Sequence, residues 1–191
     1  MVRYADDFIC GFQYKEEAET FYNELIERLK KFNLEIAKDK SKIIEFGLFA
    51  SRNRKARGEE KPETFDFLGF THYCGVSRNG KFRVKRKTSR KKFKTAIQKM
   101  KRWIRTNRMK PINEIWKGLR IKLVGHYRYY GITDNSSMIV KFWYETTKIL
   151  FKWINRRSQR RSYTWDCFLK WLKAKPLPYP KNYVSIYAQN S

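Results

Sequence analysis

The feature that most constrains the fold is a change in hydrophobic spacing near residue 88. Beyond it, apolar side chains recur at every third or fourth position, which is the spacing of amphipathic helices. The pattern predicts three helices within residues 93–104, 111–127 and 139–153, and a short fourth helix around residues 165–172. Because such helices bury their apolar faces against one another, we expect a bundle.

Before residue 88 the pattern predicts strands and turns. Residues 2–12 hold two short apolar runs around Asp6 and Asp7, which is typical of a β-hairpin with acids at its turn. A second hairpin is indicated by Asn79-Gly80, a pair favoured in tight turns.

Three further segments lie between the two hairpins. Residues 15–32 have the spacing of an amphipathic helix, which we expect to pack on the first hairpin. Residues 34–46 alternate loosely and predict a strand, and residues 47–63 are polar and without period, which predicts a surface loop. The predicted fold class is therefore α+β.

Charge separates the chain into a neutral head and a basic body. Residues 1–66 hold 13 Lys and Arg against 14 Asp and Glu, so the remaining residues hold 31 basic and four acidic side chains. A formal net charge of +26 implies a polyanionic partner, and nucleic acid is the first candidate. All six tryptophans lie in the basic body, which indicates that it folds rather than staying disordered.

Cysteines and hydropathy bear on the compartment. Cys10, Cys74 and Cys167 are widely separated, which fits neither a zinc site nor a disulfide framework and favours a reducing compartment. No apolar run approaches the ~20 residues that span a bilayer, and no signal-peptide pattern follows Met1. We expect no membrane partner and a cytoplasmic protein of a prokaryote, with an organelle as the alternative location.

Tyr4-Ala5-Asp6-Asp7 carries the clearest chemical pattern. Two adjacent carboxylates repel each other, and a bound cation relieves that repulsion. Oxygen ligands of this kind suit Mg²⁺, which takes one or two carboxylates together with substrate phosphates. Two such ions can promote nucleotidyl transfer. The alternative is that both acids are simply solvated, and the tetrapeptide alone does not decide between these interpretations.

The order of motifs supplies the resemblance. The chain resembles the C-terminal part of group II intron reverse transcriptase/maturases along its full length. Five segments carry this likeness: Arg3-Tyr4-Ala5-Asp6-Asp7-Phe8, residues 34–43, Phe67-Leu68-Gly69-Phe70, residues 125–131 (Gly-His-Tyr-Arg-Tyr-Tyr-Gly), and residues 156–165 with the following Pro-Leu-Pro. The resemblance implies a partial reverse-transcriptase palm in residues 1–87, a helical thumb or maturase domain X in residues 88–175, and an extended tail in residues 176–191.

The resemblance also implies roles for palm residues. Asp6 would be the principal Mg²⁺ ligand and Asp7 the lesser one. Lys40 matches a lysine that can donate a proton to pyrophosphate, although a solvated loop lysine is the simpler interpretation. Phe67, Leu68 and Gly69 would form the primer grip, with an ordinary buried strand as the alternative.

Basic residues near the domain boundary and in the helical part are candidates for RNA contact. Arg128 lies among tyrosines, and we expect Tyr127 to be buried and Arg128 to reach RNA. Arginine-dense and lysine-rich segments favour phosphate binding. The candidates are Arg86, Lys87, Arg90, Lys91, Arg156, Arg157, Arg160 and Arg161.

The implied function is RNA-directed DNA synthesis with intron splicing and mobility. The family's fingers and first palm strand, which carries a third metal-binding aspartate, have no counterpart before Met1, so we expect no DNA synthesis by this chain alone. The expected partners are intron RNA, a DNA primer or target, and a separate or missing N-terminal half. The alternatives are a non-catalytic RNA-binding splicing factor and a reverse transcriptase of another retroelement; no His/Cys-rich nuclease domain supports an endonuclease.

Overall fold

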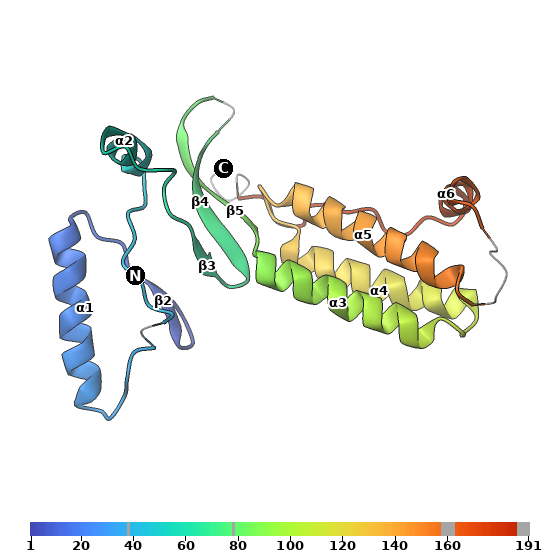
Figure 1. Ribbon diagram of the computed structural model, residues 1–191, viewed down its shortest axis with the longest axis horizontal. Helices are drawn as coiled ribbons and strands as arrows, with labels where there is room; N and C mark the ends of the chain where they lie inside the picture. Colours follow the sequence, from blue (N-terminus) through green and yellow to red (C-terminus); the bar gives the residue numbers. More distant parts are fainter. Residues whose placement is uncertain (38, 78, 158–162, 187–191) are drawn as a thin grey trace. The chain divides into compact units, whose positions relative to one another are not determined.

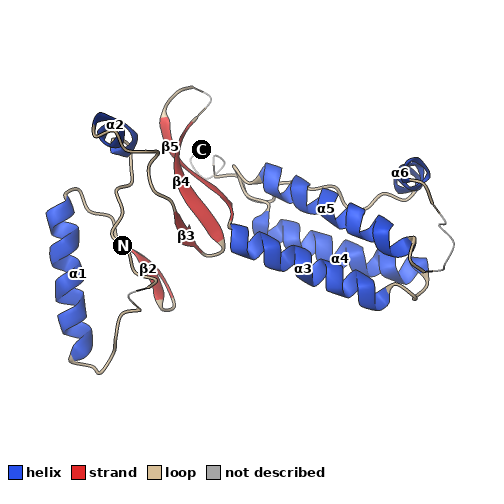
Figure 2. Cartoon of the chain, viewed as in Figure 1, coloured by secondary structure: helices blue, strands red, loops and turns tan. Residues whose placement is uncertain are grey.

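The computed structural model describes residues 1–37, 39–77, 79–157 and 163–186. It confirms the α+β class, with small β-sheets in the first half and a group of helices in the second (Figures 1 and 2). Two compact units are present: unit 1 is residues 1–67 and 73–83, and unit 2 is residues 68–72 and 84–191. Within the described ranges, no helix is long and apolar enough to cross a membrane.

Unit 1 begins with the hairpin that the acidic turn predicted. Strands β1 (Val2–Tyr4) and β2 (Asp7–Ile9) pair antiparallel. Helix α1 (Lys15–Lys30) follows, close to its predicted bounds, and Phe21 contacts Phe12 with ring centroids 5.2 Å apart. No residue of α1 is buried.

Two sequence predictions in unit 1 are wrong. Among the described residues of 34–46 there is no strand, because the segment finds no strand edge to pair with and its apolar residues alternate only loosely. The predicted loop contains helix α2 (Ala50–Ala56), whose alanines and long basic side chains are good helix formers. Gly58, with φ +73°, follows its end in the left-handed conformation that commonly terminates helices.

A three-stranded sheet in the order β3-β4-β5 follows α2. Its strands are β3 (Phe65–Phe67), β4 (Phe70–Val76) and β5 (Phe82–Thr88). The second hairpin is confirmed: β4 and β5 are joined by a short connection that includes Gly80, whose φ is +73°.

Unit 2 is the predicted bundle. It contains α3 (Arg90–Asn107), α4 (Ile112–Tyr130), α5 (Ser136–Ile154) and the short α6 (Trp165–Ala174). Helices α3 and α5 run in the same direction with α4 antiparallel to both (Figure 1). One core joins all four helices: Met100, Ile104, Ile115, Trp116, Leu119, Leu123, Tyr127, Ile139, Phe142, Leu150, Ile154, Phe168, Leu172 and Leu177.

The segment after α6 returns along the bundle (Figure 1). Leu177 joins the core, and the Tyr127 hydroxyl donates to the Pro178 carbonyl at 3.2 Å. Val184 forms a parallel bridge with Ile132, beyond the end of α4. The predicted tail is therefore bound to the bundle by hydrogen bonds as far as Ile186, and residues 187–191 lie outside the described part.

Candidate functional site

The acidic turn is a two-residue connection between β1 and β2. Tyr4 pairs with Asp7, so Ala5 and Asp6 form the turn and Asp7 is the first residue of β2. Ala5 has a φ of +51°, and the Arg3 guanidinium donates to the Ala5 carbonyl at 2.9 Å. That bond stabilises the turn conformation and leaves both carboxylates exposed.

The two aspartates fit part of a magnesium site. Their oxygens are hard ligands, and their adjacency suits an ion that also binds phosphate oxygens. Among the described residues, no group of three or more His, Cys, Asp or Glu side chains is placed to hold a metal ion. Asp6 and Asp7 would therefore hold Mg²⁺ together with substrate phosphates and ligands from elsewhere.

Lys40 lies in unit 1, in a turn where its backbone N–H donates to the Ala37 carbonyl at 2.9 Å. Its side chain is exposed. Within the described part of the chain it makes no ion pair with either aspartate, so its assignment as a proton donor stays a prediction.

Of the predicted primer-grip residues, Leu68 and Gly69 form the turn between β3 and β4, and Phe67 is the last residue of β3. Leu68 has a φ of +49° and Gly69 a φ of +81°, the combination that tight hairpin turns of type I′ require. Leucine rarely adopts such a conformation, and strained backbone of this kind persists only where surrounding contacts hold it. The turn therefore joins Phe67 of β3 to Phe70 of β4 at a local conformational cost.

Those contacts come from α4 and from Ser89, the residue that caps α3, within unit 2. The Tyr129 hydroxyl donates to the Leu68 carbonyl at 3.0 Å, and the Ser89 N–H donates to the Gly69 carbonyl at 2.9 Å. Phe70 is stacked with Tyr129, with ring centroids 6.1 Å apart. Both turn carbonyls are thus bound to the helical bundle.

Asn135 connects the same region, and the sequence predictions missed it. Its side-chain oxygen accepts from the Thr88 N–H at 2.7 Å, and its amide donates to the Thr88 hydroxyl at 2.8 Å and to the Tyr130 carbonyl at 2.7 Å. Asparagine directly before an amphipathic helix is a cap signal, which marks the position without indicating these partners.

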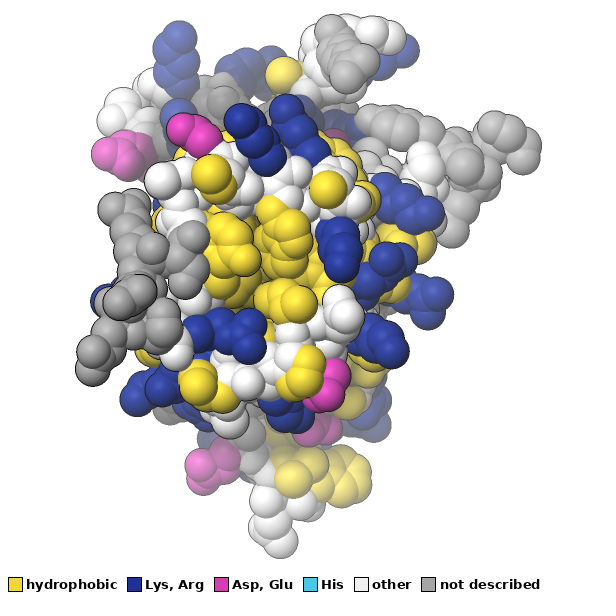
Figure 3. Space-filling model, turned by 90° about the vertical axis from the view of Figure 1, so that its right-hand side faces the viewer, with side chains coloured by type: hydrophobic (Ala, Val, Ile, Leu, Met, Phe, Trp, Pro, Cys, Tyr) yellow, Lys and Arg dark blue, Asp and Glu magenta, His cyan; other side chains and the backbone are white. Residues whose placement is uncertain are grey.

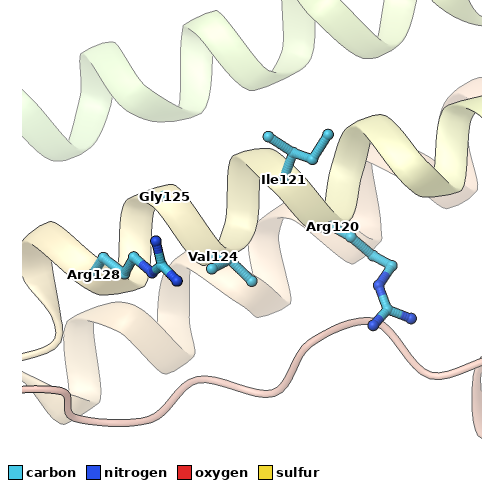
Figure 4. A pocket seen from close by; sticks show the side chains of 5 residues that line it. All are labelled: Arg120, Ile121, Val124, Gly125 and Arg128. Carbon is cyan, nitrogen blue, oxygen red and sulfur yellow. The ribbon is translucent and has the colours of Figure 1, made fainter.

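The outer face of α4 carries a shallow hollow of about 400 Å³. Arg120 and Arg128 stand at its two ends, with Ile121 and Val124 between them (Figure 4). Gly125 leaves the helix backbone uncovered at the same place, since a Cβ there would meet nothing within 4 Å. As predicted, Tyr127 is fully buried. Arg128 is exposed, and its contact with RNA stays a prediction.

His126, the residue of α4 that follows Gly125, packs against α5. Its ring stacks on Phe142 with centroids 3.6 Å apart, and its Nε2 atom is buried without a hydrogen bond. Burial lowers the pKa of His126 to about 4, so the imidazole is neutral at physiological pH.

The other predicted RNA contacts fall in two places. Lys87, Arg90 and Lys91 are exposed around the end of β5 and the start of α3, and Arg86 is half-buried. Arg90 and Lys91 are the first two residues of α3, where the helix dipole disfavours positive charge. Their charges therefore do not stabilise the helix.

The second place follows α5. Arg156 is exposed, whereas the half-buried Arg157 donates to the Lys110 carbonyl at 2.9 Å. Arg160 and Arg161 lie outside the described residues.

Residues 1–72 match the model of the family described as reverse transcriptase (RNA-dependent DNA polymerase). The matched range contains both the Asp6-Asp7 turn and the Leu68-Gly69 turn, and it supports a reverse transcriptase-like function. No curated protein and no solved structure matches the chain.

Proposed function

We propose that this protein is a group II intron reverse transcriptase/maturase component that binds intron RNA and contributes palm residues to RNA-directed DNA synthesis. The match of residues 1–72 supports the proposed role in DNA synthesis, because it includes the Asp6-Asp7 turn and the Leu68-Gly69 turn. The order of the motifs in residues 125–131 and 156–165 supports the proposed binding of intron RNA.

Asp6 and Asp7 are the proposed Mg²⁺ ligands. When bound, Mg²⁺ supplies charge stabilisation to the reacting phosphates. Within the described ranges no third acid joins these two carboxylates, so we propose that DNA synthesis requires a further polypeptide segment that supplies the remaining acid.

Primer extension on an RNA template tests the proposed role in DNA synthesis. The chain alone should give no product, and addition of a separately expressed fingers and first-palm segment from a related intron reverse transcriptase should restore synthesis. Asp6→Ala should abolish the restored synthesis, whereas Glu63→Ala, at an exposed acid outside the named motifs, should leave it unchanged. Extension by the chain alone would contradict the need for a second segment.

The α4 hollow supports nucleic-acid binding by unit 2. Arg120 and Arg128 are two helical turns apart, roughly 12 Å along the axis, and can each reach a phosphate. Gly125 and the small apolar surface between them admit a sugar–phosphate edge close to the helix backbone.

Binding of a structured RNA at several salt concentrations tests this assignment. Arg120→Gln with Arg128→Gln should weaken binding and reduce the dependence of log K on log salt by about 1.5, because each lost phosphate contact removes roughly 0.7 to 0.9. Lys31→Gln with Lys42→Gln removes the same charge from exposed positions of unit 1 and should change the salt dependence little. An equal effect of the two double variants would reject the hollow as a contact.

A non-catalytic splicing factor is the second candidate. It is favoured by the contrast between the well-packed basic unit 2 and the exposed aspartates of unit 1. Retention of splicing assistance by Asp6→Ala, together with no DNA synthesis by the complemented wild-type protein, would decide for it.

A further inference from the structure

A cluster of arginines surrounds one tryptophan where α3 and α5 end. The guanidinium carbons of Arg105, Arg108 and Arg156 lie 5.9, 5.6 and 5.6 Å from the centre of a Trp153 ring. Arg105 and Arg108 come from the end of α3, and Arg156 follows α5. These four residues are called the Trp153 cluster below.

The cluster is held in place before any ligand binds. The Trp153 ring packs against the hydrophobic core of unit 2, so it provides a fixed surface for the guanidinium groups. Arg108 also donates to the Arg105 carbonyl at 3.1 Å. Guanidinium groups stacked on a ring keep N–H groups at their edges, the geometry that suits bidentate binding of phosphate.

Local charges do not account for three arginines at this position. The C-termini of α3 and α5 together carry about one negative charge. The three arginines of the cluster, Arg157 and Lys110 bring five positive charges to the same region. In the described ranges, none of these five side chains forms an ion pair, and Glu114, the acid in the first turn of α4, pairs with none of them. The cations therefore repel one another, and a bound polyanion would relieve that repulsion.

The same end of the molecule is visible in Figure 3. Hydrophobic side chains occupy its centre and Lys and Arg side chains surround them, with few Asp or Glu. A basic border of this kind suits a backbone of repeated phosphates rather than a small neutral ligand.

We propose that the Trp153 cluster is a second RNA-binding site, which holds backbone phosphates of a structured RNA at the end of the bundle. This inference rests on the proposed RNA-binding function and adds its location. Because guanidinium groups already cover Trp153, the ring serves as their support and does not stack on a base. The cluster lies at the ends of α3 and α5, whereas the hollow is on the face of α4, so one folded RNA can reach both.

The test measures RNA affinity of the full chain with Arg105→Gln, Arg108→Gln and Arg156→Gln combined. Loss of three phosphate contacts should lower affinity about 10²-fold at 0.1 M salt and reduce the slope of log K against log salt by about 2. The matched control is Lys31→Gln, Lys42→Gln and Lys61→Gln, which removes three charges from exposed positions of unit 1 and should change affinity less than about threefold. Circular dichroism of each variant verifies that the helices are retained.

The outcomes separate the two proposals. If the unsubstituted chain fails to bind RNA, the proposed function fails. If it binds and the cluster variant loses no more affinity than the control, the function stands and the Trp153 cluster is rejected. If the cluster variant instead loses binding only to anionic vesicles or an acidic peptide, the RNA assignment is also overturned.

Discussion

Asn135 shows how a single buried side chain secures the junction between sheet and helices in unit 2. It is completely buried, and its three hydrogen bonds join Thr88 at the end of β5 to Tyr130 at the end of α4. Since Tyr129 and Ser89 are the neighbours that bind the Leu68-Gly69 turn, the position of that turn depends on the same small network.

Asn135→Ala should lower the free energy of unfolding by about 3 kcal/mol, because it leaves the buried Thr88 N–H and hydroxyl and the Tyr130 carbonyl without these partners. Urea denaturation followed by circular dichroism measures the change. The exposed Asn113 of α4 provides the control, since Asn113→Ala should cost less than about 0.5 kcal/mol. Equal stability of the two variants would contradict the role given to Asn135.

His126 makes the stability of the bundle dependent on pH. Its folded pKa of about 4 is below the ordinary value of 6.5, so the unfolded chain takes up the proton first as the pH falls. The contribution of neutral His126 to the free energy of unfolding is therefore complete above pH 6.5. It is lost as the pH falls toward 4, and the total loss is about 3 kcal/mol.

His126→Phe should remove this part of the pH dependence, because phenylalanine can stack on Phe142 without titrating. The measurement is the difference in unfolding free energy between pH 7 and pH 4.5 for both proteins, which cancels the contribution of the carboxylates that they share. An unchanged difference would show that His126 is not the responsible group.

At the scale of elements, two glycines of α4 have opposite surroundings. A Cβ on Gly118 would lie 2.5 Å from the ring of Trp103, so this glycine allows α3 and α4 to pack closely. Gly125 faces the open hollow instead, where a methyl group meets nothing.

Gly118→Ala should destabilise the protein by about 1 to 3 kcal/mol through overpacking, whereas Gly125→Ala should stabilise it by up to about 1 kcal/mol through higher helix propensity. Thermal denaturation compares the two variants directly. Gly125→Ala should also weaken RNA binding if RNA approaches the α4 backbone. A loss of stability in both variants would mean that the hollow is not open.

At the scale of the whole molecule, the two units differ in how much they bury. Ala50 is the only buried side chain among the described residues of unit 1, whereas unit 2 has a core that joins four helices. Apolar side chains such as Val2, Tyr4, Phe32 and Leu34 are more than half exposed. Local stability follows buried apolar contact, so it should be concentrated in unit 2.

Hydrogen exchange of the full chain should therefore show rapid exchange in α1 and slow exchange in the centres of α4 and α5. If a second polypeptide segment covers unit 1, as the proposed function requires, adding that segment should slow exchange in α1 and leave α4 unchanged. Strong protection of α1 in the chain alone would contradict this division of stability.

Local sequence signals determined the acidic hairpin, the second hairpin and the four helices of unit 2, because turn residues and apolar periodicity act over a few neighbouring positions. They failed for residues 34–46, since a strand exists only where another strand edge is available. They also missed α2, whose seven residues are too few to display a helical period.

The sequence by itself therefore determined the α+β class, the basic character of the second half and the two candidate aspartates. Only the tertiary structure decided that Tyr129 and Ser89 hold the Leu68-Gly69 turn, that Asn135 joins β5 to α4, and that three arginines meet on Trp153. The physical reason is that these contacts join residues up to 61 positions apart, and their partners are chosen by how the helices pack rather than by any pattern along the chain.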